Sequence, residues 1–428
     1  MAIQTVPHAF VEVTTQQTIN SASFVDVPGA IINQSNFVAG RKYLLVITSQ
    51  ISNANNESAT QIRLVHGSTG FTESDEEIEI QDVDSRGTWF FFTVWTAIAS
   101  EDIKVQLLRR AGLAQIDQVT MFALEISEEL TENTDWFFDE DITNLLLTTT
   151  FSTANNAEIT FTPPNAGDDW LILASGTIAN NAFTDAMESR IKRSGEASDV
   201  ATQVSREVEG VFDIYQQTMA RIFNLGNASN TFTQQSRNAI ANRFTNQRTR
   251  SVIFAINLSK FTEHSFNYTQ GEIDPVDTPD FGTEVQTNSI TPTNLTDVWC
   301  FGYFHRVGGV VNGIDKARMQ IDNVDQPPTQ TADGYLQLFG WDVSDELWWA
   351  LQSIENLDAT PHNIDLDVSA VNASVKIEDR LVFAVQLTTG VPVPLPPEIG
   401  NSQKSISTDG IPKPISTDTL HGVTSRGE

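Results

Sequence analysis

A five-residue pattern of apolar and polar positions occurs three times along the chain. It reads Phe-Ala-Leu-Glu-Ile at 122–126, Phe-Ala-Ile-Asn-Leu at 254–258 and Phe-Ala-Val-Gln-Leu at 383–387. In a strand this alternation puts Phe and two aliphatic side chains on one face, and Ala and a polar side chain on the other. Each copy therefore predicts a strand with one buried face, and three copies predict three cores.

Two other landmarks precede each copy in the same order. One is an apolar strand led by an aromatic residue, at Tyr43, Trp170 and Trp299. The other is an Arg followed by a hydrophobic residue, at Arg63, Arg190 and Arg318. The shared order and similar spacing predict an internal repeat of about 130 residues, which is too long for a solenoid unit and suits a domain.

Short strand patterns bounded by polar turns fill each repeat. In the first repeat they fall at 24–27, 43–47, 61–65, 77–80, 88–96, 103–108 and 122–126. Their number and spacing favour an antiparallel sandwich of the jelly-roll type. Residues 207–223 resemble an amphipathic helix, but their β-branched and aromatic content favours strands. The predicted fold is all-β: three tandem antiparallel jelly-roll-like β-sandwich domains at 1–130, 131–260 and 261–388, with an extended C-terminal arm at 389–428.

The last forty or so residues differ in composition from the rest. Residues 390–397 are rich in Pro and favour an extended polyproline-like path, and Ile-Ser-Thr-Asp at 406–409 recurs at 415–418. One interpretation is a floppy tail. The other, which the recurrence favours, is an arm that lies along a neighbouring subunit and becomes ordered on assembly.

Length and charge limit the number of domains and the classes of partner that we expect. The chain has 428 residues, which also suggests about three domains. Its formal net charge of −30 repels nucleic-acid phosphates and anionic membranes, so we expect neither as a partner. The negative charge favours solubility. The alternative is that it serves to bind a divalent cation or a basic partner. No stretch approaches the ~20 apolar residues of a membrane span, and no secretory signal is visible.

Motifs for catalysis are missing from the sequence. The single cysteine, Cys300, lies in a core-like run and is expected to be a buried, inert thiol. The six histidines are scattered, with none at metal-ligand spacing, and no nucleotide-binding or hydrolase motif occurs. We expect that the protein is not an enzyme, that no residue serves a catalytic, cofactor-binding or metal-binding role, and that no cofactor is bound.

Acidic clusters are the remaining candidates for chemistry. Seven carboxylates between Glu73 and Asp84 include oxygen ligands of the kind that Ca²⁺ takes. Their spacing fits no EF-hand, however, and the alternation of Glu77 and Glu79 favours the solvated face of a strand. The acidic and aromatic run at 135–141 favours packing between domains.

Basic and aromatic residues leave further alternatives open. The repeated Arg63, Arg190 and Arg318 suit solvent-facing or interface ion pairs. The second repeat is richer in bases and could be a face on which an acidic neighbouring subunit docks. Its bases include Arg190, Lys192, Arg193, Arg206, Arg221, Arg237, Arg243, Arg248 and Arg250. Exposed Trp341, Trp348 and Trp349 could stack on sugar rings, although core or interface packing is the commoner use.

The opening and closing strands together resemble a known family. Gly-Arg-Lys-Tyr-Leu-Leu-Val at 40–46 and the closing pattern at 122–126 are similar to the strands of complement-C1q/tumour-necrosis-factor-like jelly rolls. Such domains also occur in virion structural proteins of tailed bacteriophages. The resemblance implies a non-enzymatic assembly module, either a homo-oligomer (trimer) or a pseudo-trimer. Capsid decoration, a head fibre or a tail component are the implied roles, with capsid or tail proteins as partners.

The same resemblance implies a location in the virion after synthesis in the host cytoplasm. It transfers no site residue, because every matching position is a packing position. The alternative function is a receptor- or carbohydrate-binding adhesin that uses its loops and the three Trp residues.

Overall fold

The structure is a computed structural model. It describes residues 6–53, 58–71, 74–80, 86–98, 101–110, 112–151, 156–179, 185–196, 202–208, 214–238, 247–271, 273, 283–307, 314–326, 336–339, 346–371 and 376–387. The described residues lie within Met1–Gly390, which forms one compact unit. The predicted arm at 389–428 lies outside the described residues, and the division of the remainder into three domains stays a prediction.

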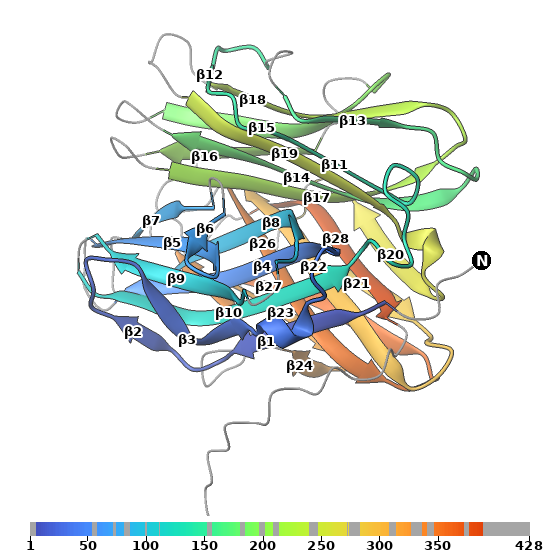
Figure 1. Cartoon of the computed structure of the whole chain (residues 1–428), viewed down its shortest axis with the longest axis horizontal. Helices are drawn as coiled ribbons and strands as arrows, with labels where there is room; N and C mark the ends of the chain where they lie inside the picture. Colours follow the sequence, from blue (N-terminus) through green and yellow to red (C-terminus); the bar gives the residue numbers. More distant parts are fainter. Residues whose placement is uncertain are drawn as a thin grey trace, which may run out of the picture. The chain divides into compact units, whose positions relative to one another are not determined.

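The described strands pair into six antiparallel sheets, two for each sequence repeat, and we name each pair of sheets a sandwich (Figure 1). The first sandwich contains β1 (His8–Val13), β2 (Gln17–Ile19), β3 (Val25–Ile32), β4 (Lys42–Asn53), β5 (Ser58–His66), β6 (Thr69–Gly70), β7 (Glu76–Ile80), β8 (Arg86–Thr96), β9 (Ile103–Arg109) and β10 (Ala114–Glu125).

The second sandwich contains β11 (Trp136–Asp141), β12 (Leu145–Leu146), β13 (Glu158–Phe161), β14 (Asp168–Ala179), β15 (Asp185–Arg193), β16 (Thr202–Val208), β17 (Ile214–Leu225), β18 (Asn230–Asn238) and β19 (Gln247–Asn257). The third contains β20 (His264–Thr269), β21 (Thr283–Ile290), β22 (Thr296–Val307), β23 (Ile314–Ile321), β24 (Val324–Gln326), β25 (Leu336–Phe339), β26 (Glu346–Leu357), β27 (His362–Val371) and β28 (Lys376–Leu387). Two short 3₁₀ turns, η1 (Gln34–Asn36) and η3 (Leu258–Lys260), complete these elements.

Strand order is the same in the three sandwiches and is that of a jelly roll. The inner sheets run β1-β10-β4-β8, β11-β19-β14-β17 and β20-β28-β22-β26, so each joins the first, eighth, third and sixth of eight common strands. The outer sheets join the second, seventh, fourth and fifth, as in β13-β18-β15-β16. The all-β, antiparallel jelly-roll class predicted from the strand patterns is therefore confirmed.

The closing strand differs from the prediction, because both of its faces are buried. Phe122 and Leu124 of β10 belong to a cluster that contains residues of all three sandwiches, whereas Met121 and Ala123 face the interior of the first sandwich. All four are 0% exposed. The three expected separate cores are also corrected. The first and third sandwiches each have an interior of their own, and a third cluster joins the second sandwich's interior to the surface between sandwiches.

The seven strands predicted in the first repeat all appear, as β3, β4, β5, β7, β8, β9 and β10. The preference for strands over a helix at 207–223 is correct, because β16 and β17 occupy this region. The first strand, β1, was not predicted, and neither were β11 and β20, which begin the next two sandwiches. No helix among the described residues is long and apolar enough to span a membrane.

Candidate functional site: the contacts between the sandwiches

An aromatic and aliphatic core lies where the three inner sheets meet. Phe122 of the first sandwich and Trp299 of the third have ring centroids 4.6 Å apart, and those of Phe90 and Phe301 are 5.7 Å apart. Trp136 and Leu173 of the second sandwich belong to the same cluster. We name this cluster the shared core. Its Phe and Trp side chains bury large apolar areas, and this burial is the main favourable free-energy term holding the sandwiches together.

Trp299 is not equivalent to Tyr43 and Trp170, with which the sequence pattern groups it; it is displaced by one residue. Tyr43 pairs with Glu125 and Trp170 with Asn257, and the residue at this register in the third sandwich is Val298, which pairs with Gln386. Trp299 is therefore one place further along β22. Because neighbouring residues of a strand point to opposite faces, Trp299 lies in the shared core whereas Tyr43 lies inside its own sandwich.

The first strands begin with side chains that reach a neighbouring sandwich. His8 of β1 lies 3.3 Å from Asp297 of β22, measured from Nε2 to Oδ2. At the same register in β11, the ring of Trp136 has the Lys42 ammonium of β4 at 5.3 Å from its centroid. The first sandwich thus contacts the third, and the second contacts the first.

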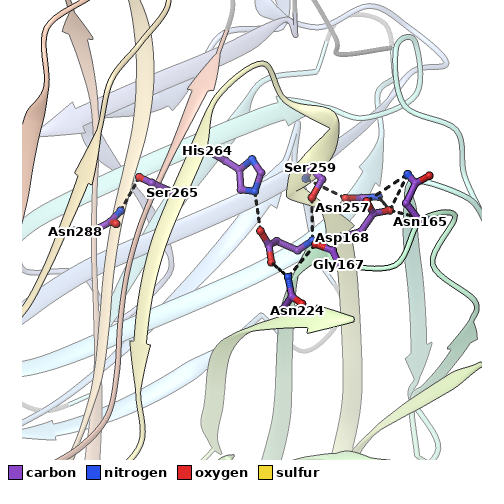
Figure 2. A network of polar contacts seen from close by, with 10 residues as sticks. Asn165, Gly167, Asp168, Asn224, Asn257, Ser259, His264, Ser265 and Asn288 are labelled. Carbon is purple, nitrogen blue, oxygen red and sulfur yellow. Dashed lines mark hydrogen bonds and ion pairs between the residues drawn. The ribbon is translucent and has the colours of Figure 1, made fainter. Parts of the chain in front are cut away.

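His264 of β20 completes this cycle of contacts. Its Nε2 lies 3.0 Å from Oδ2 of Asp169 in β14, so the third sandwich contacts the second (Figure 2). Asn224 donates to the other oxygen of Asp169 at 2.7 Å, and Ser259 accepts from the Asp169 backbone N–H at 2.9 Å. These bonds fix the carboxylate of Asp169 against the joint between the second and third sandwiches.

The fifth and sixth strands form a second cycle of contacts, which runs in the opposite sense. β7 of the first sandwich lies against β17 of the second, β16 against β26 of the third, and β25 against β8 of the first. Side chains also bond to backbone across these joints. Thr218 of β17 donates to the carbonyl of Phe90 at 2.7 Å, and Gln352 of β26 donates to that of Val46 at 3.0 Å. Strand edges that an isolated jelly roll would present to solvent are therefore in contact with a neighbouring sandwich.

Polar pairs lie beside the shared core at the far end of each first strand. Arg250 Nε donates to Glu140 Oε1 at 2.5 Å in the second sandwich, and Tyr268 donates to Asp379 at 2.8 Å in the third. Glu12 holds the corresponding register in β1. Burial raises the pKa of Glu12 to about 7; the nearby polar side chain of Gln118 opposes this, and the charge of Glu355 in the third sandwich adds to it.

Asp379 has the most constrained backbone of these residues. Its φ is 39°, in the region that L residues seldom adopt, and it lies where the pairing of β22 with β28 shifts register. Burial raises its pKa, while the hydrogen bond from Tyr268 and the charges of His305, Arg221 and Arg380 lower it. Positively charged Arg221 comes from the second sandwich, so its attraction to Asp379 acts between sandwiches.

The repeated Arg residues form one cross-strand arrangement. Arg63 Nε and Nη2 donate to Gln106 Oε1 at 2.9 and 2.8 Å, and the guanidinium carbon lies 3.8 Å from the centroid of the Phe24 ring. Arg190 makes the same two bonds to Gln235 and lies 3.8 Å from the ring of Phe151. The predicted ion pair holds for the third copy, where Arg318 Nε donates to Asp367 at 2.9 Å.

The structure does not support a basic docking face made of the second repeat's Arg residues. Arg248 is 0%, Arg250 1% and Arg221 8% exposed, so these three are not available to a docking subunit. They were expected at the surface because a sequence does not reveal which Arg side chains meet an internal carboxylate or ring. Arg190, Arg193 and Arg237 are partly buried and bonded within the sandwich. Arg243 and the side chain of Arg206 lie outside the described residues.

Some of the other candidate residues from the sequence lie in the described part of the structure, and the rest lie outside it. Cys300 is buried, as expected, and burial raises its pKa well above the usual value. Trp136 in the run at 135–141 packs in the shared core, as expected. Glu73, Asp82, Asp84 and Trp341 lie outside the described residues, as do the side chains of Glu77, Glu79, Trp348 and Trp349. Within the described ranges, no group of three or more His, Cys, Asp or Glu side chains is placed to hold a metal ion.

Sequence reasoning missed two sets of residues. Ser127 accepts a hydrogen bond from the backbone N–H of Lys42, and Ser259 accepts one from that of Asp169, each at 2.9 Å. In each of these two sandwiches this bond joins the residue after the closing pattern to the start of the third common strand, β4 or β14. A hydroxyl follows all three closing patterns, with Thr388 in the last, and this was a usable signal. The histidines were the second set: each one in the described residues lies against a carboxylate, at His8, His66, His264, His305 and His362.

These contacts are suited to holding the sandwiches together. No protein-family model matches the chain, and no curated protein matches it. Among solved structures, the chain is 10% identical to one titled for the triple jelly roll fold and turret assembly in an archaeal virus, with 88% of this chain and 91% of that chain covered and a TM-score of 0.19.

Two other solved structures have comparable scores. A peptide-N(4)-(N-acetyl-β-D-glucosaminyl) asparagine amidase is 10% identical, with 59% of this chain and 97% of that chain covered and a TM-score of 0.30. The N-terminal CBM22-1-CBM22-2 tandem domain from Paenibacillus barcinonensis is 8% identical, with 53% and 81% covered and a TM-score of 0.16. Likenesses this weak say nothing about what the chain does.

Proposed function

We propose that this chain is a non-enzymatic virion structural protein, used as capsid decoration, head fibre or tail component. Its three sandwiches form a pseudo-trimer within one chain, and its C-terminal arm at 389–428 joins it to neighbouring capsid or tail proteins. The observation that carries the proposal is the shared core, to which all three sandwiches contribute 0%-exposed side chains such as Phe122, Phe254 and Phe383.

The cyclic contacts support a building-block role. Each sandwich supplies an inner sheet, a first-strand side chain and a fifth strand to its neighbours, and the third sandwich returns to the first. The described histidines lie against carboxylates, and two of these contacts, His8–Asp297 and His264–Asp169, join sandwiches. Side chains that are often used for chemistry thus serve packing, as they do in an assembly module.

The test is to purify the particles encoded by the genome that carries this gene and to quantify their proteins by mass spectrometry. The proposal predicts this chain in fixed proportion to the major capsid protein, and purified chain that binds capsids lacking it. Particles without the chain, or purified chain that binds no capsid, would overturn the proposal. Binding to a glycan array that is lost in Trp348→Ala would instead support the adhesin.

A further inference from the structure

The interior of the second sandwich is polar at six positions where that of the first is apolar. Ser189, Gln217, Gln234, Ser236, Arg248 and Ser251 are all 0% exposed. The residues at matching register in the first sandwich are Ile62, Trp89, Val105, Leu107, Ile116 and Val119, all in its apolar interior. This polar interior is thus not demanded by the fold.

Most of these polar groups satisfy one another. Ser251 donates to Gln234 Oε1 at 2.6 Å, and Gln234 Nε2 donates to Ser236 at 3.0 Å. Ser189 bonds to Ser236 at 3.0 Å. Gly176 lies against this network, since a Cβ added there would come 2.7 Å from Gln234 Nε2. The buried Ser and Gln side chains therefore form a tightly packed hydrogen-bond network.

Arg248 is the exception within this network. Its Nη1 donates to Asn156 Oδ1, but its Nε and Nη2 have no hydrogen-bond partner and are buried. Arg248 pairs with Ile178 in the bulged part of β19, and the matching positions hold Ile116 in β10 and Ile377 in β28, both 0% exposed in apolar interiors. A guanidinium thus replaces an isoleucine at one of three equivalent sites.

The two free donors are the pair that binds a planar acceptor. Nε–H and Nη2–H lie along one edge of the guanidinium and point in nearly the same direction, which matches the two oxygens of a carboxylate. The same edge is occupied in Arg63 and Arg190, where a Gln oxygen takes both bonds. In Arg248 neither donor on this edge has a hydrogen-bond partner, so the edge has the geometry to bind a carboxylate.

Charge points to the same ligand. A buried cation without a counter-ion is strongly unfavourable, and burial lowers the pKa of Arg248 to about 10, which still leaves it charged at neutral pH. The charge of Asp141 opposes that shift, but a carboxylate oxygen of Asp141 accepts from the backbone N–H of Thr143. An anion on the free edge would add a counter-charge that is bonded directly to the guanidinium.

We propose that the free edge of the Arg248 guanidinium binds the carboxylate group of a small anion inside the second sandwich. The ligand is compact, of the size of formate or acetate, because the Arg248 side chain that binds it is 0% exposed. The site is separate from the contacts between the sandwiches and from the arm, so it does not depend on the role in the virion.

Calorimetric titration of the full chain with sodium formate and sodium acetate, in a carboxylate-free buffer at constant ionic strength, tests the proposal. Sodium chloride is the matched control, because chloride has no second acceptor atom. We expect saturable binding of a carboxylate and a melting temperature that rises with its concentration. Absence of saturable binding, or an equal response to chloride, would overturn the proposal. This test requires no variant, because it uses the unaltered protein.

Variants locate the site. Arg248→Met keeps an unbranched chain of similar length without the donors and is expected to weaken carboxylate binding at least about tenfold. In carboxylate-free buffer it should melt no lower than the unaltered protein, because it removes an unpaired buried charge. Arg63→Met, whose edge is already occupied, should bind as before. Undiminished binding by Arg248→Met, or a much lower melting temperature of this variant without carboxylate, would contradict the assignment.

Discussion

Phe122 of β10 and Trp299 of β22 pack against each other across the joint between the first and third sandwiches, with ring centroids 4.6 Å apart and an interplanar angle of 33°. Both side chains belong to patterns that recur along the sequence, yet their meeting depends on the one-residue offset of Trp299 within its strand. The contact links parts of the chain that are far apart in sequence, and it makes the stability of one sandwich depend on another.

The coupling between these two rings is measurable. Trp299→Leu, which introduces the residue found at matching register as Leu44 and Leu171, should lower the free energy of unfolding by roughly 2–3 kcal/mol through the cavity that it leaves. With Phe122→Leu in a double-mutant cycle, we expect a coupling energy of about 0.5–1.5 kcal/mol. Denaturant unfolding measures both values, and strictly additive effects would show that the rings do not interact.

Truncation of the closing Phe residues tests whether the core is shared. Phe254→Ala and Phe383→Ala should each reduce stability by about 3–5 kcal/mol, because both side chains are 0% exposed. Since these residues lie in one cluster with residues of all three sandwiches, we expect the whole body to unfold in one transition at lower denaturant. Phe383→Leu is the milder control. Separate loss of the altered sandwich, with the other two unaffected, would argue for independent cores.

Glu12 makes stability depend on pH in a direction that can be worked out. Its folded-state pKa of about 7 lies above the ordinary 4.5, chiefly because of burial. The stabilisation is therefore complete below about pH 4.5 and is lost as pH rises through about 7. Relative to the unaltered protein, Glu12→Gln should gain roughly 1 kcal/mol between about pH 5 and pH 8, after allowance for partial solvent exposure.

Thermal or urea unfolding at both pH values measures this difference. Glu129, which is exposed, provides the control, because Glu129→Gln should leave the pH dependence unchanged. An equal pH dependence in Glu12→Gln and the unaltered protein would mean that Glu12 ionises normally in the folded state.

The hydroxyl after the closing strand gives a fourth prediction. Ser259→Ala leaves the backbone N–H of Asp169 without its acceptor and should reduce stability by about 1 kcal/mol. Ser259→Thr keeps a hydroxyl, as Thr388 does in the third repeat, and should be nearly neutral. If both variants lose the same amount, the effect arises from packing and the hydrogen bond contributes little.

The sequence patterns were sufficient for the parts of the fold that depend on one chain segment at a time. Seven strands of the first repeat and the repeated Arg positions follow from alternation and spacing, and Arg63, Arg190 and Arg318 do occupy matching strands. The strand β1 escaped detection because His8, Phe10 and Glu12 share the face toward the other sandwiches. That face mixes polar and apolar residues, so it gives no strand pattern.

The contacts between sandwiches were less predictable still. Whether an alternating strand is buried on one face or two depends on what covers its second face, and Ala123 and Glu125 look solvent-facing in sequence although both are buried. Likewise, the Lys and Arg residues of the second repeat look like surface residues in the sequence, and only the fold shows that Arg248 and Arg250 are inside. The arm remains a sequence-based prediction.

We infer that three sandwiches of one chain bury against each other the faces for which separate subunits would otherwise be needed. Sedimentation equilibrium can compare a chain ending at residue 388 with the full-length chain. We expect the shortened chain to stay folded and to have the mass of a monomer, and only the full-length chain to assemble further. A stable trimer of the shortened chain would contradict the claim, and equal assembly of both chains would remove the role of the arm.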